Sequence, residues 1–290
     1  MQRSDRHTRT SQLAASHVMR EYSTSFSLAT RLLPPHVRTH ITSIYSLVRV
    51  ADEVVDGAFP GASPEQKIAE LDALESRVRD AHACGFSTDA YVHAFAWSAR
   101  RVGIGPAQWE PFFASMRTDA RPEPHGSDSL RAYVHGSAEV VGEMCLLAFL
   151  DGDPVPAARR EGLFRGARAL GSAFQKVNFL RDLREDGDGL GRSYFPDTAH
   201  AGPTEEQKDA IVADIRDELT RAWAMIPFLP SRVRPAVRLA HDLFAALNDA
   251  LDEAPAESLT QVRVSVPTRR KLALAAGALS GRGRPGTVRR

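Results

Sequence analysis

Helical spacing of apolar residues runs through nearly the whole sequence. Apolar side chains recur every three or four residues, as in amphipathic helices, whereas half-buried strands alternate apolar and polar positions. Only residues 262–266, reading VRVSV, offer a local strand pattern. We therefore predict an all-α protein of about ten helices. Their expected ranges are 9–20, 24–31, 37–55, 64–83, 88–101, 106–117, 128–150, 156–186, 204–226, 230–252 and 266–279.

Length and composition are those of an ordinary globular protein. The chain has 290 residues, of which 43% are hydrophobic and 25% charged, enough to bury a sizeable core. No repeat or low-complexity linker divides it, so we predict a single domain over residues 1–290. The core is expected over about residues 15–280, and the basic ends are expected to be disordered.

Charge, cysteine content and hydropathy argue against a nucleic-acid-binding, disulfide-rich or membrane-spanning protein. Net charge is +1, from 37 basic and 36 acidic residues, so no overall field favours a nucleic-acid partner. Cys84 and Cys145 are expected to be reduced thiols. No signal peptide and no run of ~18 apolar residues is found. We predict a cytoplasmic protein, with a peripheral contact to the inner face of the membrane as an alternative.

A column of polar side chains ends the helix expected over residues 156–186. Asn178, Asp182 and Asp186 are spaced i, i+4, i+8, so a helix would project them from one face. The glycine-rich turn that follows brings Arg192 near. A solvated acidic face is the ordinary explanation of such a column. Here the host helix is apolar, which favours burial, and buried carboxylates require cations.

A second acidic set ends the helix expected over residues 37–55. Asp52 and Asp56 are spaced i, i+4, Glu53 is adjacent, and Arg49 and Tyr45 lie upstream on the same stripe. One DxxxD spacing is a weak signal. Two of them, each at the C-terminal end of an apolar helix, are more informative, because the helix dipole disfavours carboxylates there by about 0.3–1 kcal/mol. Such violations of local rules tend to mark function.

Together the two sets predict a metal-diphosphate site. Facing one another across a cavity, they would offer the hard oxygen ligands that Mg²⁺ takes while it bridges to phosphate oxygens. Arg49, Arg181 and Arg192 would balance the remaining phosphate charge. No P-loop, GxGxxG or HExxH motif is present, so nucleotide and zinc chemistry lack support.

Four blocks resemble the squalene/phytoene synthase family, in order and in spacing. They read YSTSFSLATRLLP at 22–34, IYSLVRVADEVVDG at 44–57, YVHGSAEVVGEMC at 133–145 and LGSAFQKVNFLRDLREDGDGLGRSYFP at 170–196. The resemblance covers about residues 15–280 and is strongest to bacterial, actinobacterial-type phytoene synthases.

The resemblance implies an isoprenoid-synthase-type helical bundle with a central cavity. The implied enzyme is a prenyltransferase of carotenoid biosynthesis, of the 15-cis-phytoene synthase type, that condenses two geranylgeranyl diphosphates head to head through prephytoene diphosphate. Mg²⁺ would be the cofactor, with Mn²⁺ as a substitute and no need for NADPH. A hydrocarbon product would explain contact with a membrane.

Three alternatives to this reading remain. The same chemistry on two farnesyl diphosphates would give squalene, dehydrosqualene or presqualene diphosphate. A non-catalytic assembly factor of this fold would need an eroded acidic motif, and neither motif is eroded. A class I terpene cyclase would need a DDxxD-like motif, which Asp52-Glu53 fits loosely.

The resemblance also implies roles for individual residues. The implied metal ligands are Asp52, Asp56, Asn178, Asp182 and Asp186, and the four aspartates are also catalytic together with Tyr45 and Arg49. The implied substrate-binding residues are Ser23, Ser25, Tyr45, Arg49, Tyr133, His135, Gln175, Asn178, Arg181 and Arg192. The chain departs from the family at two positions: His135 stands where a tyrosine is common, and Lys176 replaces an apolar residue and is expected to face away from the pocket.

Several of these residues have ordinary structural explanations. Arg49 could simply pair with Asp52 on a helix surface. Ser23 and Ser25 could be helix N-caps, a role compatible with phosphate binding. Tyr133 and His135 could be core residues of a long helix.

Overall fold

The structure is a computed structural model that describes residues 3–56, 59–121, 126–183 and 202–280. Within these ranges every regular element is helical, which confirms the all-α prediction. The α-helices are α1 (Arg3–Tyr22), α2 (Thr24–Thr30), α3 (Pro35–Val55), α4 (Pro64–Cys84), α5 (Ala90–Val102), α6 (Pro106–Ala120), α7 (Ser127–Val134), α8 (Val140–Leu150), α9 (Ala157–Arg181), α11 (Glu205–Met225), α12 (Arg234–Glu253) and α13 (Thr268–Ser280). Shorter turns are the π-helical η1 (His135–Glu139) and the 3₁₀ turns η2 (Ile226–Phe228) and η3 (Ala256–Thr260).

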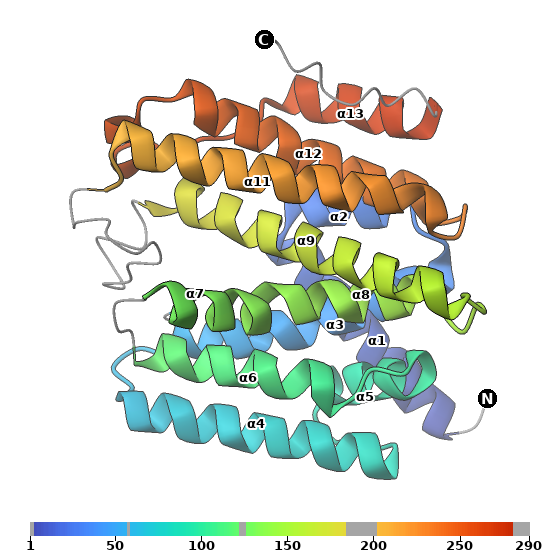
Figure 1. The fold of residues 1–290 in the computed structure, drawn as a ribbon. Coiled ribbons are helices and arrows are strands. Elements are labelled where there is room, and N and C mark those ends of the chain that lie inside the picture. The colour runs from blue at the N-terminus through green and yellow to red at the C-terminus, as the bar shows by residue number, and fades with distance from the viewer. Residues whose placement is uncertain (1–2, 57–58, 122–125, 184–201, 281–290) are drawn as a thin grey trace.

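The long helices lie roughly side by side and stack from α4 at one edge to α13 at the other (Figure 1). One core cluster is built mainly from α3 to α6 and α8, and a second from α9, α11 and α12. Leu170 of α9 packs against both clusters. Helix α9 therefore lies between the two halves of the core.

Helix starts follow local sequence signals. The Ser63 hydroxyl accepts a hydrogen bond from the Gln66 backbone N–H at 3.3 Å, and the Gln66 side chain accepts one from the Ser63 N–H at 2.8 Å. Thr204 and Gln207 form the same reciprocal pair at the start of α11. These capping boxes satisfy backbone donors that a helix N-terminus leaves unpaired.

The helix predicted over residues 128–150 is divided by the π-turn η1. Gly136 lies in this turn, and a Cβ there would come within 2.2 Å of the Pro111 carbonyl oxygen of α6. The stretch Asp128–Leu150 is long and apolar enough to cross a membrane, but 61% of its apolar window is buried inside the protein. Burial against α3, α6 and α9 accounts for that hydropathy.

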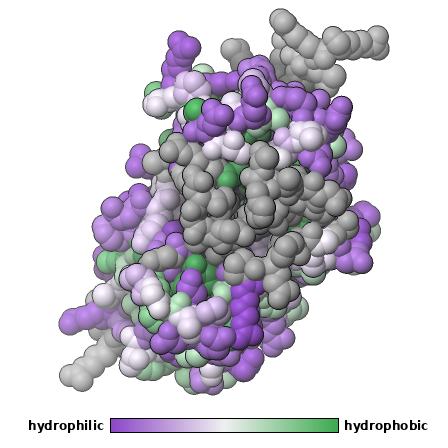
Figure 2. Space-filling view, turned by 90° about the vertical axis from the view of Figure 1, so that its left-hand side faces the viewer, coloured by the Kyte–Doolittle hydropathy of each residue, from purple (hydrophilic) through white to green (hydrophobic). Residues whose placement is uncertain are grey.

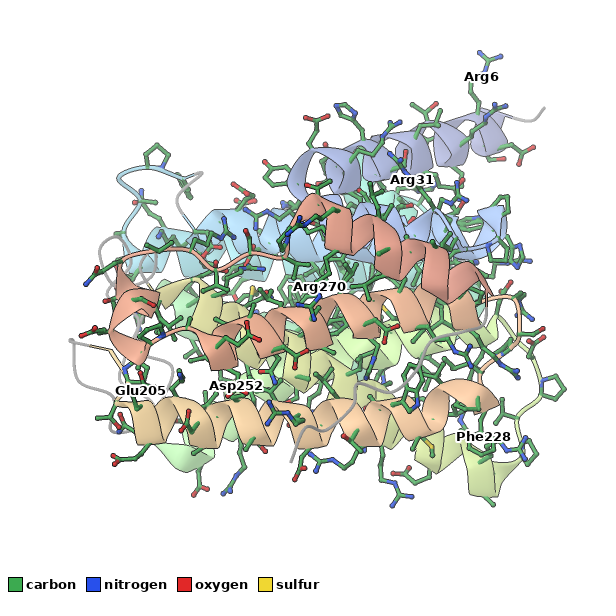
Figure 3. All side chains as sticks on the ribbon, turned by 90° about the horizontal axis from the view of Figure 1, so that it is seen from above. Arg6, Arg31, Glu205, Phe228, Asp252 and Arg270 are labelled. Atoms are coloured by element: carbon green, nitrogen blue, oxygen red, sulfur yellow. The ribbon has the colours of Figure 1, made fainter. Side chains whose placement is uncertain are left out.

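Two further differences from the predicted elements concern helix ends. Helix α9 ends at Arg181 rather than at residue 186, and Asp182 is its C-cap, with φ −101° and ψ 11°. Residues 262–266 form no strand. They lead into α13, which runs beside α12 when seen from above (Figure 3). Arg270 of α13 pairs with Asp249 of α12 at 3.5 Å. The single-domain organisation stays a prediction.

Candidate active site

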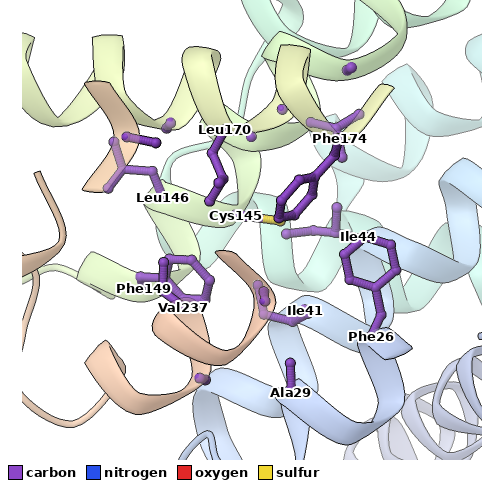
Figure 4. A pocket seen from close by; sticks show the side chains of 18 of the residues that line it. Phe26, Ala29, Ile41, Ile44, Cys145, Leu146, Phe149, Leu170, Phe174 and Val237 are labelled. Atoms are coloured by element: carbon purple, nitrogen blue, oxygen red, sulfur yellow. The ribbon is translucent and has the colours of Figure 1, made fainter. Parts of the chain in front are cut away.

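A cavity of about 290 Å³ lies in the middle of the bundle, between the two core clusters. Its walls come from α2, α3, α8, α9, α12 and the C-terminal end of α11, and they are mainly apolar. Figure 4 shows side chains of these elements converging on the cavity. They include Phe26, Ile41, Ile44, Cys145, Leu146, Phe149, Leu170, Phe174 and Val237. Burial raises the pKa of the Cys145 thiol to about 12, so that thiol stays neutral.

Three predicted site residues, Tyr45, Gln175 and Asn178, line the cavity. Asp182 lies one helical turn beyond Asn178, and Asp52 lies two turns beyond Tyr45. The C-terminal ends of α3 and α9 lie at the same end of the molecule (Figure 1). The two acidic motifs thus lie just beyond Tyr45, Gln175 and Asn178, which form the polar end of the cavity. Figure 2 looks onto this end, where the described surface is largely hydrophilic.

The first motif is organised around Arg49. Its guanidinium donates to Asp52 at 2.5 Å and also to Glu53. Burial opposes the charge of Arg49, but the neighbouring carboxylates prevail and raise its pKa above the ordinary value. The guanidinium also lies 4.6 Å from the ring centre of Tyr22, and its Nε is buried without a hydrogen-bond partner among the described residues. Asp56 is the C-cap of α3.

The second motif is described up to Leu183. Asp182 accepts hydrogen bonds from Arg181, whose Nε lies 2.9 Å from Oδ1, and the same oxygen pairs with Arg263 at 3.1 Å. Arg263 comes from the loop before α13, and nothing in the sequence pattern pointed to it. Asp186 and Arg192 lie outside the described residues. Among the described residues, no three His, Cys, Asp or Glu side chains converge as a metal-binding group.

Ser23 caps α2 and also contacts the cavity tyrosine. Its hydroxyl accepts a hydrogen bond from the Phe26 backbone N–H at 3.1 Å. Burial raises the pKa of the Tyr45 phenol, and a hydrogen bond with the Ser23 side chain acts in the opposite direction. Ser23 is therefore an N-cap that also reaches the polar end of the cavity. The side chain of Ser25 lies outside the described residues.

Tyr133 and His135 lie outside the cavity lining. Tyr133 is buried, and its hydroxyl donates to the buried Asp119 at 2.9 Å. It is therefore a core residue, which was the structural alternative to a binding role. His135 is 45% exposed and its Nδ1 lies 2.9 Å from a Glu139 oxygen. The π-turn that starts at His135 changes the direction of the side chains after α7. The binding roles of both residues stay predictions.

Lys176 faces α11, as expected for a residue directed away from the cavity. Its ammonium pairs with Asp214 at 2.5 Å and with Glu218 at 2.8 Å. Burial opposes the charge of Lys176, but these two carboxylates raise its pKa. The Glu218 carboxylate also accepts a hydrogen bond from Ser172 at 2.8 Å. This network joins α9 to α11 and leaves the opposite face of α9 to the cavity.

Ser137 is a cavity residue that sequence reasoning missed. It lies in the π-turn and lines the cavity, and its hydroxyl oxygen is buried without a partner among the described residues. A buried hydroxyl without a partner costs about 1–3 kcal/mol. The sequence offered no signal for it, because its direction depends on the packing of η1 against α6 and α9.

Comparison with known proteins identifies the family. The squalene/phytoene synthase profile matches residues 19–270. The chain belongs to the squalene/phytoene synthase family. Phytoene synthase 3 of Zea mays is 37% identical over 180 residues, which is 62% of this chain and 41% of the maize protein. Phytoene synthase of Mycobacterium tuberculosis is 34% identical over 184 residues, which is 62% of this chain and 55% of that protein. The chain thus spans about half the length of the curated relatives it matches.

Solved structures of low sequence identity share the fold of this family member. A dehydrosqualene synthase superposes with a TM-score of 0.79 at 20% identity, covering 96% of this chain and 98% of the other. The squalene synthase HpnC from Alicyclobacillus acidocaldarius superposes with a TM-score of 0.66 at 20% identity, covering 84% and 94%. These matches confirm the predicted isoprenoid-synthase helical bundle.

Proposed function

We propose that this family member is a prenyltransferase of the phytoene synthase type. It would join two geranylgeranyl diphosphates head to head, through prephytoene diphosphate, in a reaction that requires a divalent metal ion. Support comes from the family profile and from relatives named phytoene synthases at 34–37% identity. Mg²⁺ is the proposed ion, and Mn²⁺ would substitute for it.

The observation that carries the proposal is the cavity with its polar end. Its apolar walls suit a prenyl chain. Tyr45, Gln175 and Asn178 line its polar end, and the two acidic motifs come next along α3 and α9. A prenyl diphosphate is amphipathic in the same sense, with a long apolar tail and a compact anion at one end. The match between cavity and substrate is therefore one of shape and polarity.

The carboxylates at this end fit a divalent cation in kind. Mg²⁺ takes hard oxygen ligands, usually only one or two carboxylates, and completes its coordination with water and substrate phosphate. Among the described residues, the ligands would be Asp52 of α3 with Asp56 at its C-cap, and Asn178 of α9 with Asp182 at its C-cap. When bound, the ion would neutralise diphosphate charge and make the diphosphate a better leaving group.

Arg49 and Arg181 would hold the diphosphate itself. Each already contacts an acidic motif, through Asp52 and Asp182. The Arg49 Nε, buried without a partner in the described chain, is a donor available to a phosphate oxygen. Guanidinium groups bind phosphates through charge-assisted hydrogen bonds, so a diphosphate would join the arginines and metal-bound carboxylates into one network.

The cavity walls would protect the reacting carbons. Phe26 and Phe174 line the cavity with ring centres 5.9 Å apart, and Phe174 stacks on Phe244 at 3.7 Å. Aromatic faces stabilise nearby cations, by about 0.5–2 kcal/mol per contact. Apolar walls also exclude water, which would otherwise capture an allylic cation. The rings and the dry cavity thus suit chemistry that passes through carbocations.

One incubation tests the proposal. Purified protein is incubated with Mg²⁺ and either geranylgeranyl or farnesyl diphosphate, with and without NADPH, and hydrocarbon products are identified by mass spectrometry. A C40 product that forms without NADPH is the expected result. If products formed from farnesyl diphosphate and not from geranylgeranyl diphosphate, the proposed reaction would be wrong and squalene-type chemistry would be favoured. No turnover of either diphosphate would favour the non-catalytic alternative.

The cellular setting is also a proposal. We expect the protein in the cytoplasm, with its hydrocarbon product passing to a membrane surface. Cell fractionation would test this: protein that stays soluble while its product collects in the membrane fraction supports a peripheral encounter.

A further inference from the structure

The cavity runs along α9 from a polar end to an apolar end. Lining residues on α9 extend from Leu163 to Asn178, about 22 Å at 1.5 Å per residue. At the end opposite Asn178, the walls come from the last turn of α11, from η2 and from the first turns of α12. Figure 3 shows Glu205, where α11 begins, at one end of the bundle, and Phe228 of η2 near the other. The apolar end is therefore remote from both acidic motifs.

Met225 occupies this apolar end. It is the last residue of α11, and it lines the cavity beside Ile226 and Leu229. Its side chain lies against two glycines of α9, one turn apart. A Cβ at Gly166 would come within 2.7 Å of the Met225 Cβ and Cγ, and a Cβ at Gly162 would come within 3.2 Å of its sulfur. Because the two glycines have no side chains, they leave the space that Met225 fills.

We propose that Met225, packed on Gly162 and Gly166, ends the cavity and sets the longest prenyl chain that the enzyme accepts. The inference rests on the proposed function, because it assumes a prenyl diphosphate with its anion at the acidic end. From Asn178 to Gly166 the cavity extends about 18 Å along the helix. That length is comparable with an extended C20 chain, so one more isoprene unit would meet Met225.

The chemistry of methionine suits a boundary of this kind. Its side chain is unbranched and has three rotatable bonds, so it fills an irregular gap left by two glycines better than a branched side chain would. Truncation of Met225 would extend the cavity along its axis. Truncation of a side-wall residue would widen the cavity and leave its length unchanged. A longer cavity should therefore favour longer prenyl chains, whereas a wider cavity should not.

The test measures the affinities of unreactive thiolodiphosphate analogues of C15, C20 and C25 chains by calorimetry in the presence of Mg²⁺. Met225→Ala is expected to improve the affinity for C25 relative to C20 by at least ~10-fold over the wild-type ratio, because a further isoprene unit becomes buried. Met225→Val provides a milder truncation if the alanine variant unfolds. Product analysis with the corresponding diphosphates should show the same change in preference.

Leu170→Ala is the matched control, since it also removes three heavy atoms but from the side wall in the middle of the cavity. It should change all three affinities without moving the preference toward C25. If the Met225 variants bind C20 normally and the C25 to C20 ratio stays at the wild-type value, Met225 does not end the cavity. If the wild-type protein binds none of the analogues, the proposed function itself is wrong.

Discussion

At the residue scale, aspartates of both acidic motifs form ion pairs with arginines in partly buried surroundings, unlike the carboxylates of an exposed helix face. Asp52 pairs with Arg49, and Asp182 pairs with Arg181 and Arg263. The Asp182 side chain is 18% exposed and that of Arg181 is 23% exposed. If a metal ion binds as proposed, it would replace an arginine as the partner of these half-buried carboxylates. The pairs explain how a column of like charges is tolerated before any ligand binds.

Asp182→Asn should abolish turnover while leaving the fold intact. Asparagine keeps the shape of the side chain but removes the charge that a divalent cation requires, and we expect a loss of at least ~10²-fold in kcat. Unfolding free energy should change by no more than about 1 kcal/mol, because partly exposed ion pairs contribute little. Steady-state kinetics and thermal melts of the same preparation measure the two effects.

Asp214→Asn is the control for this substitution. It makes the same chemical change at a residue that pairs with Lys176 on the face of α9 turned toward α11, away from the cavity. Its activity should remain within about twofold of wild type, as expected for a surface substitution. A large loss of stability in Asp182→Asn, with activity following stability, would show that Asp182 is structural.

At the element scale, the helices were predictable because their signals are local. Capping boxes at Ser63 and Thr204, and apolar spacing within each segment, depend on residues close in sequence. The π-turn at 135–139 and the end of α9 at Arg181 were missed. The π-turn packs where Gly136 meets the Pro111 carbonyl, a contact between residues far apart in the chain. Long-range packing of this kind leaves no periodic signal.

The same limit explains which site residues could be predicted. Tyr45 and Asp52 lie on α3 and Asn178 lies on α9, at spacings from Asp56 and Asp182 that are visible in the sequence. Arg263 reaches Asp182 from a distant loop, and Ser137 faces the cavity because of a distorted turn. Neither placement follows from local spacing, so both required the structure.

Gly171→Ala tests the close packing of α9 on η1. A Cβ at Gly171 would lie 2.4 Å from the Ala138 carbonyl oxygen, and a backbone atom cannot rotate away. The helices must separate, so unfolding free energy should fall by about 1–3 kcal/mol. Chemical denaturation measures this loss.

Gly277→Ala in α13 is the matched control, because no atom of the described residues lies within 4 Å of the new Cβ. It should be neutral or stabilising by up to about 1 kcal/mol, as glycine is a poorer helix former than alanine. If both variants had the same stability, the contact between α9 and η1 would not be tight.

At the scale of the whole molecule, the two acidic motifs come from different halves of the bundle. Helix α3 belongs to one core cluster and α9 contributes mainly to the other, with the cavity between them. A ligand that engages both motifs would therefore join the two halves. Binding to the folded state alone raises stability in proportion to the logarithm of ligand concentration over Kd.

Mg²⁺ and inorganic diphosphate together should raise the Tm more than the sum of their separate effects. At about 100 times Kd, binding contributes about 2.7 kcal/mol, which corresponds to a rise in Tm of about 4 °C for a chain of 290 residues. The shift should vanish with EDTA and in Asp182→Asn, and Asp214→Asn should retain it. Differential scanning fluorimetry measures all of these. Additive effects of metal and diphosphate, or a full shift in Asp182→Asn, would contradict a clamp in which the metal and the diphosphate bind together at Asp182, because ligands that bind independently stabilise the folded state additively.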